Sequence, residues 1–184
     1  LDAIPAPVFY KDLQGRYLGV NRAFCRFYGK SEEEMKGRTV FDVASPEMAA
    51  LYHLRDQEIL RGGGVQVYES RIRDAQGNLR DVVFHKALFA GEDGAVRGLI
   101  GVILDVTEHK RAEEDLARSQ SFLRTLVDSI PDLIWLKDPQ GIYLSCNPSF
   151  ERFFGAREAQ ILGRTDEDFL GPELAAFFRD HDRK

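Results

Sequence analysis

Histidine and cysteine are the side chains of this sequence that most often bind metals or act as bases and nucleophiles. They are scattered along the chain, at His53, His85, His109, His181, Cys25 and Cys146. No H-E-x-x-H pair or other metal-ligand spacing links them. The sequence also lacks a G-x-S-x-G elbow, a Walker loop and a kinase glycine-rich loop. It therefore predicts a stretch of protein without catalytic activity and without a bound metal.

Composition and charge narrow the possible partners. Of the 184 residues 43% are hydrophobic and 30% are charged, which is typical of a soluble globular protein. The net charge of −5 gives no basic surface for nucleic acid. No apolar run approaches the roughly 20 residues of a membrane span. With two cysteines that lack partners at a metal spacing, we expect a cytoplasmic piece of a longer protein, whose parent can be membrane-anchored.

One stretch of the chain occurs twice. The pattern of Leu1–Thr39 returns without a gap 126 positions later, as Val127–Thr165. Lys11-Asp12 corresponds to Lys137-Asp138, and Asn21 corresponds to Asn147. A period of this length indicates two copies of a domain, because solenoid repeats are shorter.

Caps and periodicity predict the elements of the first copy. Asn21 is a natural N-cap, Gly29 a C-cap, and Ser31 with Glu34 has the spacing of a capping box. The expected order is two strands, several helices and three strands: 7–11, 16–20, short helices after Asn21 and Ser31, a helix at Pro46–Arg61, then strands at Val65–Arg73, Leu79–Phe89 and Val96–Val106. This order predicts an α+β fold, with a five-stranded antiparallel sheet and helices on one face.

A helical segment links the two copies. Glu108–Ile130 is rich in helix-forming residues. Apolar or small residues recur there with the spacing of a heptad seam, at Ala112, Leu116, Ser119, Leu123, Leu126 and Ile130. The second copy reaches Lys184, the counterpart of Glu58, and has no equivalent of the last three strands. We therefore predict a complete or nearly complete domain at 1–107, a coiled-coil-like linker helix at 108–130, and the N-terminal part of a second domain at 131–184.

The repeated motifs resemble the PAS sensor domain. They are KDxxGRYLxxN, NRAFCRFYG and SEEEMKGRT. In the first copy the resemblance also rests on the closing strand GLIGVILDVTEHKRAEE, in which Asp105-Val106-Thr107 is similar to the D-x-T ending of that family. The resemblance implies tandem PAS domains, the second truncated, in a bacterial-type signalling protein such as a two-component histidine kinase or a diguanylate cyclase. The implied role is sensing without catalysis.

The resemblance places any small-molecule ligand on the sheet face beneath the helices. Strand alternation assigns a largely apolar set of residues to that face: Phe9, Phe24, Phe27, Tyr68, Ser70, Ile72, Val82, Phe84, Leu99 and Ile103. In the interior that these residues form, only Tyr68 and Ser70 are expected to offer hydrogen bonds. A packed core without a ligand is therefore the competing interpretation.

The resemblance implies two possible cofactors, haem and flavin, although we expect neither in this chain. Haem would require an axial histidine from the helix before the third strand, where His53 stands. A flavin of the light-sensing type would require a reactive cysteine, but Cys25-Arg26-Phe27 lies on an earlier helix than that motif requires.

The end of the first copy is the candidate site of signal transmission. Asp105 or Thr107 can cap the linker helix, and Asp105 has capping-box spacing to Glu108. The resemblance implies that this junction couples the sheet to the helix, with Leu116 and Leu123 in its seam. We expect self-association through the linker helix, the PAS surface or both. The alternative function is a ligand-free dimerisation or spacer module.

Overall fold

The computed structural model describes residues 1–175 and 177. Two compact units are distinguished within the chain, Leu1–Glu113 and Glu114–Lys184. Each unit is described by itself below. Helix α5, which spans Thr107–Ser129, contributes residues to both.

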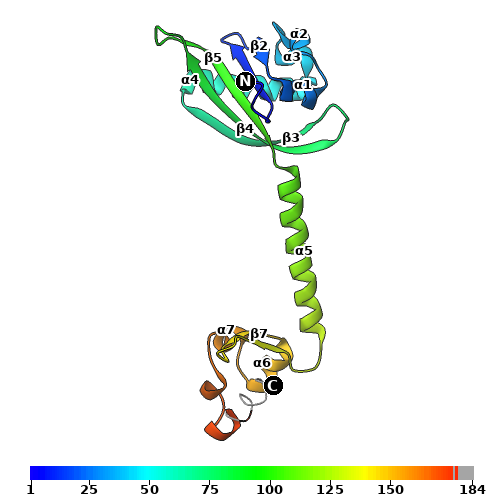
Figure 1. Ribbon diagram of the computed structural model, residues 1–184, viewed down its shortest axis with the longest axis vertical. Coiled ribbons are helices and arrows are strands. Elements are labelled where there is room, and N and C mark those ends of the chain that lie inside the picture. The colour runs from blue at the N-terminus through cyan, green and yellow to red at the C-terminus, as the bar shows by residue number, and fades with distance from the viewer. Residues whose placement is uncertain (176, 178–184) are drawn as a thin grey trace. The chain divides into compact units, whose positions relative to one another are not determined.

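The first unit contains a five-stranded antiparallel sheet, as predicted (Figure 1). Its strands lie in the spatial order β2-β1-β5-β4-β3. Their bounds are β1 Val8–Asp12, β2 Tyr17–Val20, β3 Val65–Arg73, β4 Leu79–Ala90 and β5 Val96–Asp105. The chain therefore places its first strand beside its last, and β5 is the central strand, flanked by β1 and β4.

Four helices connect β2 to β3 and pack on one face of the sheet. They are α1 Arg22–Tyr28, α2 Glu32–Met35, α3 Val40–Val43 and α4 Pro46–Gly62. The predicted caps are present: Asn21 accepts from the backbone N–H of Phe24, and Gly29 ends α1 with a positive φ of 67°. Ser31 and Glu34 form the predicted capping box of α2. The side chains between helices and sheet form one hydrophobic cluster.

The side chain of Asn21 also holds the chain entering β1. Its Oδ1 accepts from the backbone N–H of Val8 at 2.9 Å, and its Nδ2 donates to the carbonyl of Ala6 at 2.9 Å. The second unit repeats this arrangement with Asn147, which accepts from Ile134 and donates to Asp132. A buried amide that satisfies several backbone groups thus fixes the start of both copies.

Helix α5 follows β5 directly and has 23 residues. It begins at Thr107 and ends at Ser129, one residue earlier at each end than predicted. Among the described residues, no helix is both long enough and apolar enough to span a membrane.

The second unit repeats the first elements of the first unit. It contains β6 Trp135–Lys137, β7 Tyr143–Cys146, α6 Pro148–Phe154, α7 Glu158–Ile161 and the 3₁₀ helix η1 Asp166–Asp168. The two strands pair with each other in a separate two-stranded sheet. Its buried core is small and consists of Tyr143, Cys146, Phe150 and Ile161.

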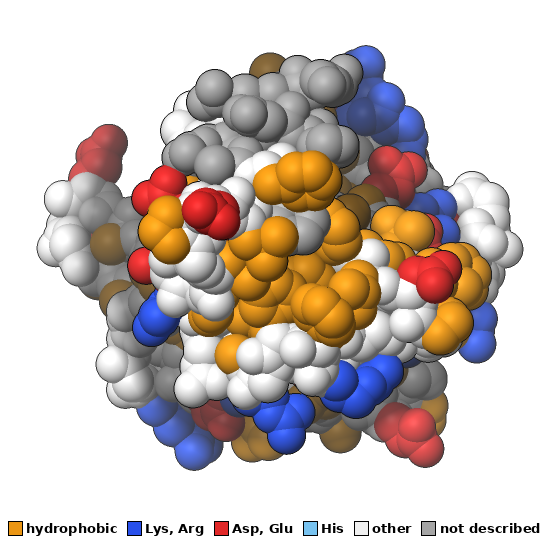
Figure 2. Space-filling view, turned by 90° about the horizontal axis from the view of Figure 1, so that it is seen from below, with side chains coloured by type: hydrophobic (Ala, Val, Ile, Leu, Met, Phe, Trp, Pro, Cys, Tyr) orange, Lys and Arg blue, Asp and Glu red, His pale blue; other side chains and the backbone are white. Residues whose placement is uncertain are grey.

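Large apolar side chains remain exposed on the second unit, and Figure 2 shows hydrophobic side chains gathered on one of its faces. They include Leu136, Leu144, Phe153, Leu162 and Leu174. A two-stranded sheet with short helices can bury only part of its apolar surface.

Candidate functional site

Most of the predicted pocket residues of the first unit lie in its hydrophobic cluster. Seven of them are buried there: Phe9, Phe24, Ile72, Val82, Phe84, Leu99 and Ile103. Phe27 and Tyr68 are partly buried and pack against the cluster, and Ser70 is half-buried on β3. The strand faces are therefore assigned correctly, while the role of these residues in binding stays a prediction.

A charged cluster that the sequence analysis did not identify lies among these residues. The two ammonium groups of Lys11 on β1 and Lys86 on β4 share the carboxylate of Asp56 on α4. The Nζ–Oδ distances are 2.6 Å for Lys11 and 2.5 Å for Lys86. The three residues, called the charged cluster below, are each at most 2% exposed. Ionised groups are rarely buried to this extent unless they are paired.

Aromatic rings surround the charged cluster. The Lys11 ammonium lies 4.6 Å from the ring centre of Tyr17, and the Lys86 ammonium lies 5.2 Å from that of Tyr68. Burial lowers the pKa values of both lysines below their ordinary range, and the Asp56 carboxylate opposes part of that effect. When all three groups of the charged cluster are ionised, two cations share one anion, and the interior is polar with one positive charge in excess.

The expectation that only Tyr68 and Ser70 offer hydrogen bonds in this interior is wrong. Lys11 stands two residues after Phe9, and Lys86 two residues after Phe84, so strand alternation places both on the inner face. Lysine is usually exposed, which is why the pattern is easily read as an apolar face alone. The position of Asp56 opposite both lysines depends on how α4 packs across the sheet.

A cavity of about 20 Å³ adjoins the charged cluster. Its lining is aromatic and polar: Phe9, Lys11, Tyr17, Phe24, Tyr28, Val40, Tyr52, Phe84, Lys86 and Ile103. Burial raises the pKa of Tyr52 to about 12 and raises the pKa values of Tyr17 and Tyr28 further. These phenols are therefore protonated at neutral pH and can donate hydrogen bonds.

The residues of this interior do not fit haem or flavin. A cavity of about 20 Å³ has room for about one water-sized group. His53 is half-buried on α4, its ring 5.2 Å from that of Phe41, and it is not among the cavity-lining residues. Burial raises the pKa values of the thiols of Cys25 and Cys146, the latter to about 11, which disfavours the reactive thiolate. No cluster of metal-binding side chains occurs among the described residues.

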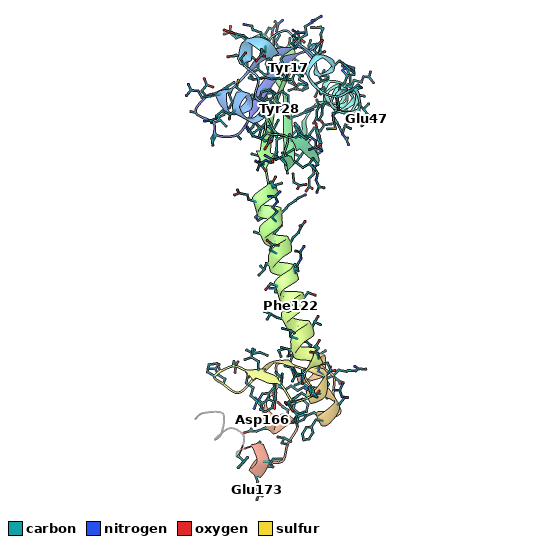
Figure 3. The ribbon with its side chains drawn as sticks, turned by 90° about the vertical axis from the view of Figure 1, so that its right-hand side faces the viewer. Tyr17, Tyr28, Glu47, Phe122, Asp166 and Glu173 are labelled. Atoms are coloured by element: carbon teal, nitrogen blue, oxygen red, sulfur yellow. The ribbon has the colours of Figure 1, made fainter. Side chains whose placement is uncertain are left out.

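The second unit contains a related but different polar group. Asp166 on η1 accepts from Lys137 Nζ at 2.7 Å and from the hydroxyl of Tyr143 at 2.5 Å. Figure 3 labels Asp166 in the second unit and Tyr17 and Tyr28 in the first. Lys137, Tyr143 and Asp166 occupy the repeat positions that carry, in the first unit, Lys11, Tyr17 and Val40. Thus the lysine and tyrosine are shared, and the carboxylate at the third position is not.

The predicted transmission residues Asp105 and Thr107 lie where β5 becomes α5. The buried Thr107 accepts from the backbone N–H of Asp81 on β4 through Oγ1, at 2.9 Å. The backbone N–H of Val106 donates to the carbonyl of Asp81, also at 2.9 Å. Lys110, one turn along the helix, pairs with Glu69 on β3 at 2.5 Å. The first turn of α5 is thus held by two strands in addition to β5.

The predicted capping box between Asp105 and Glu108 is not formed. Asp105 Oδ1 accepts from the backbone N–H of Thr107 at 2.9 Å, which is two residues on instead of three. This is the geometry of an Asx turn, because the helix begins at Thr107 and leaves Asp105 outside it. Asp105 also lies 3.7 Å from Arg80 on β4.

The heptad positions of α5 are exposed. Leu116 is 60% and Leu123 57% exposed, and Phe122 projects from the helix nearby (Figure 3). Leu126 is also exposed. An apolar stripe on a 23-residue helix normally needs a partner surface for the helix to be stable.

Comparison with known proteins decides the family. The sequence model of the PAS fold matches residues 1–111 and 127–184. The chain belongs to the PAS fold family. The chain is similar to the aerobic respiration control sensor protein ArcB of Escherichia coli, with 32% identity over 130 residues that cover 71% of this chain and 17% of ArcB.

Two further comparisons find similar proteins. The uncharacterized protein y4lL of Sinorhizobium fredii is 30% identical over 154 residues, which cover 83% of this chain and 19% of that protein. The PAS domain of BvgS from Bordetella pertussis superimposes with a TM-score of 0.51 at 24% identity, over 64% of this chain and 91% of that domain, and it supports the fold alone. The chain spans about a fifth of the length of these curated relatives.

Proposed function

We propose that the chain is a tandem PAS module that senses a cue in its first unit and transmits it without catalysis. The cue acts on the interior around the charged cluster. The response leaves through the Asp105–Thr107 junction into α5 and reaches the second unit. The parent protein would be a sensor of the histidine kinase or diguanylate cyclase type, located in the cytoplasm or anchored with this part facing it.

The connection between interior and junction carries this proposal. Ile103 lines the cavity and stands two residues before Asp105 on β5. Lys86 belongs to β4, the same strand whose residue Asp81 holds Thr107 and Val106. A shift of either strand at the cavity therefore acts on the backbone groups that fix the start of α5. Discrete hydrogen-bonded links of this kind can carry coupling between two sites.

Self-association through α5 is the second part of the proposal. The exposed stripe around Leu116 and Leu123 has heptad spacing, and polar residues surround it. A second copy of the chain covers such a stripe most simply, with the helices parallel so that both second units leave at the same end. A change in the orientation of α5 would then alter the pairing of two identical outputs.

A ligand-free dimerisation module is the rival function. It shares the exposed stripe on α5 but requires no coupling between the interior and the helix. The two functions therefore differ in whether a change at the charged cluster reaches α5.

Amide hydrogen exchange of the 184-residue protein tests the transmission route. Lys86→Met changes the interior, whereas Thr107→Val removes the hydroxyl that accepts from Asp81. We expect Lys86→Met to change protection along residues 108–120, and the double variant to lose that effect. Thr107→Ser keeps the hydroxyl and is the matched control, in which the effect should persist. Unchanged protection of α5 in Lys86→Met would favour the rival function, and an effect that survives Thr107→Val would place the route elsewhere.

A further inference from the structure

Hydrogen-bond donors outnumber acceptors in the interior of the first unit. Each ammonium group of the charged cluster has three N–H donors, and one bond from each, to Asp56, is recorded among the described residues. Tyr17 lines the cavity, and burial raises the pKa of its hydroxyl, which therefore stays protonated and can donate a hydrogen bond. The hydroxyl of Tyr68, over whose ring the Lys86 ammonium lies, is buried without a partner in the described part of the chain. Such a set of groups is complementary to a ligand rich in acceptors.

The charge of the cluster also favours binding of a ligand with acceptor atoms, in particular an anion. Two ammonium groups and one carboxylate leave one positive charge in excess when all three are ionised. Removing an uncompensated charge from water is costly, and a bound anion would offset that cost. An anion would also accept hydrogen bonds from the ammonium groups, which are among the strongest donors in proteins.

The second unit contains an acceptor of this kind within its own chain. There the carboxylate of Asp166 lies within hydrogen-bond distance of both Lys137 and Tyr143. In the first unit the corresponding position is Val40, which has no polar atom and lines the cavity. The lysine and tyrosine donors are thus retained in the first unit without the carboxylate that binds them in the second.

We propose that the cavity of the first unit binds the carboxylate group of a small ligand, with Lys11, Lys86 and Tyr17 as its hydrogen-bond donors. The ligand carboxylate takes the role that Asp166 has in the second unit. The inference deepens the proposed sensor function, on which it rests, by naming the chemical class of the cue.

The size of the cavity limits the ligand. A volume of about 20 Å³ accepts about one water-sized group, so even formate requires the cavity wall to move, and the smallest carboxylates require the least movement. A larger carboxylate requires α3 or α4 to move, since these helices supply Val40 and Tyr52 to the cavity wall. Movement of α4 would also displace Asp56 from the two lysines, which links ligand size to a change in the charged cluster.

Titration with sodium formate tests the inference, with formamide as the uncharged control of similar size. The 184-residue protein is labelled for NMR, and the side-chain signals of Lys11 and Lys86 are followed at constant ionic strength. We expect saturable shifts with a dissociation constant of about 1 mM, because a ligand with so few atoms has limited binding energy. Formamide and sodium chloride at the same concentrations should not produce these shifts.

Two variants and one control test which residues bind formate. Val40→Asp places a carboxylate where the second unit has one, and formate should bind at least about tenfold more weakly. Val40→Thr changes the same position without charge and should bind formate with about the affinity of the original protein. Lys86→Met leaves the neutral pair of Lys11 with Asp56 and should also weaken binding about tenfold or more.

The outcomes separate this inference from the proposed function. No saturable response to formate, an equal response to chloride or formamide, or unaltered formate affinity in both Val40→Asp and Lys86→Met would overturn the inference. Formate binding that leaves the amide exchange of α5 unchanged would support the carboxylate site and overturn the transmission route. If Lys86→Met changed the amide exchange of α5 but the protein did not bind formate, the transmission route would be supported and the carboxylate site overturned.

Discussion

The two copies of the repeat share a lysine on their first strand, but they differ in the number of charged groups around it. Both begin with a buried asparagine that fixes the first strand, and both place a lysine on the inner face of that strand. In the second unit Asp166 from η1 reaches this lysine and a tyrosine. In the first unit Asp56 from α4 reaches two lysines instead. The scaffold is thus conserved within the chain while the polar interior differs.

This difference separates residues that support the fold from residues that can define a ligand. The asparagine satisfies backbone groups in both copies, so its role is to hold the first strand. Position 40, by contrast, is apolar beside a cavity in the first unit, and its counterpart in the second unit, Asp166, is a hydrogen-bonded carboxylate. We interpret the retained lysine and tyrosine as a shared donor pair and the third position as the variable that decides whether one carboxylate of the chain accepts from both.

The largest expected difference between the two units is the loss of stability when the carboxylate of each polar group is removed. Asp56→Ala leaves two buried ammonium groups without their anion and should lower the free energy of unfolding of the first unit by about 3–5 kcal/mol. Asp166→Ala removes hydrogen bonds in the less enclosed second unit, where we expect a loss of about 1–3 kcal/mol. Urea unfolding measures both, with amide signals for the first unit and the fluorescence of Trp135 for the second. Equal losses would show that the two clusters do not differ in charge balance.

Lys86→Met is the control for that prediction, because it removes the excess cation and leaves Lys11 paired with Asp56. Replacing a buried charge by an apolar side chain of similar length is often neutral or stabilising. We therefore expect the free energy of unfolding to be unchanged or higher. A loss comparable to that of Asp56→Ala would mean that Lys86 is required as a cation even without a ligand.

Local patterns were sufficient to predict the scaffold. The bounds of β3, the cap at Asn21 and the positive φ of Gly29 follow from residues that are neighbours in the sequence. The inner faces of the strands follow from alternation. The charged cluster did not follow in the same way, because Asp56 is 45 positions from Lys11 and 30 from Lys86. Its formation depends on the packing of α4, which no local pattern specifies.

The junction between β5 and α5 could also be predicted only in part from the sequence. The sequence indicated Asp105 and Thr107 as the residues that connect sheet and helix, and the structure places them there. It assigned their partners incorrectly, because a cap was expected within α5. Thr107 instead accepts from Asp81, a residue 26 positions away on a neighbouring strand. Partners from other strands cannot be read from the spacing of a capping motif.

Substitutions in helix α5 test whether two chains associate through its exposed apolar stripe. Leu116→Glu with Leu123→Glu would place two charges in the proposed seam and should weaken a dimer about 100-fold or more, because buried unpaired charges are costly. Ala117→Glu with Ser121→Glu adds the same charges on the opposite side of α5 and should leave the dimer intact. Sedimentation of the variants measures the effect. A double leucine variant that stays dimeric would place the partner surface elsewhere.

Removing the hydroxyl of Thr107 should have a smaller effect, confined to the first unit. Thr107→Val leaves the backbone N–H of Asp81 without its acceptor and should lower the free energy of unfolding by about 1–3 kcal/mol. Thr107→Ser retains the acceptor and should recover most of this loss. Amide signals of β4 during urea unfolding provide the measurement, and the second unit should be unaffected. Equal losses in both variants would point to the methyl group of Thr107 instead of its hydrogen bond.

The smallest expected effect is a dependence of stability on alkaline pH that differs between the first unit and its Lys86→Met variant. The pKa values of Lys11 and Lys86 are lowered on folding because burial disfavours the ammonium form. Below the unfolded pKa of about 10.5 the unfolded chain therefore holds more protons at these lysines, so stability should rise with pH towards that value. The buried tyrosines act in the opposite sense: their pKa values are raised, to about 12 for Tyr52, so their contribution falls above pH of about 10.

Lys86→Met isolates the lysine contribution, because the tyrosines remain. Its unfolding free energy, measured with urea between about pH 7 and 10, should rise less steeply than that of the original protein, since the remaining Lys11 has Asp56 to itself and is more easily kept as a cation. The two curves should converge at high pH, where the excess charge has been lost by deprotonation. Parallel curves over the whole range would mean that both lysines titrate alike in the folded and unfolded chain, and the excess cation on which the difference between the two copies depends would have no energetic consequence.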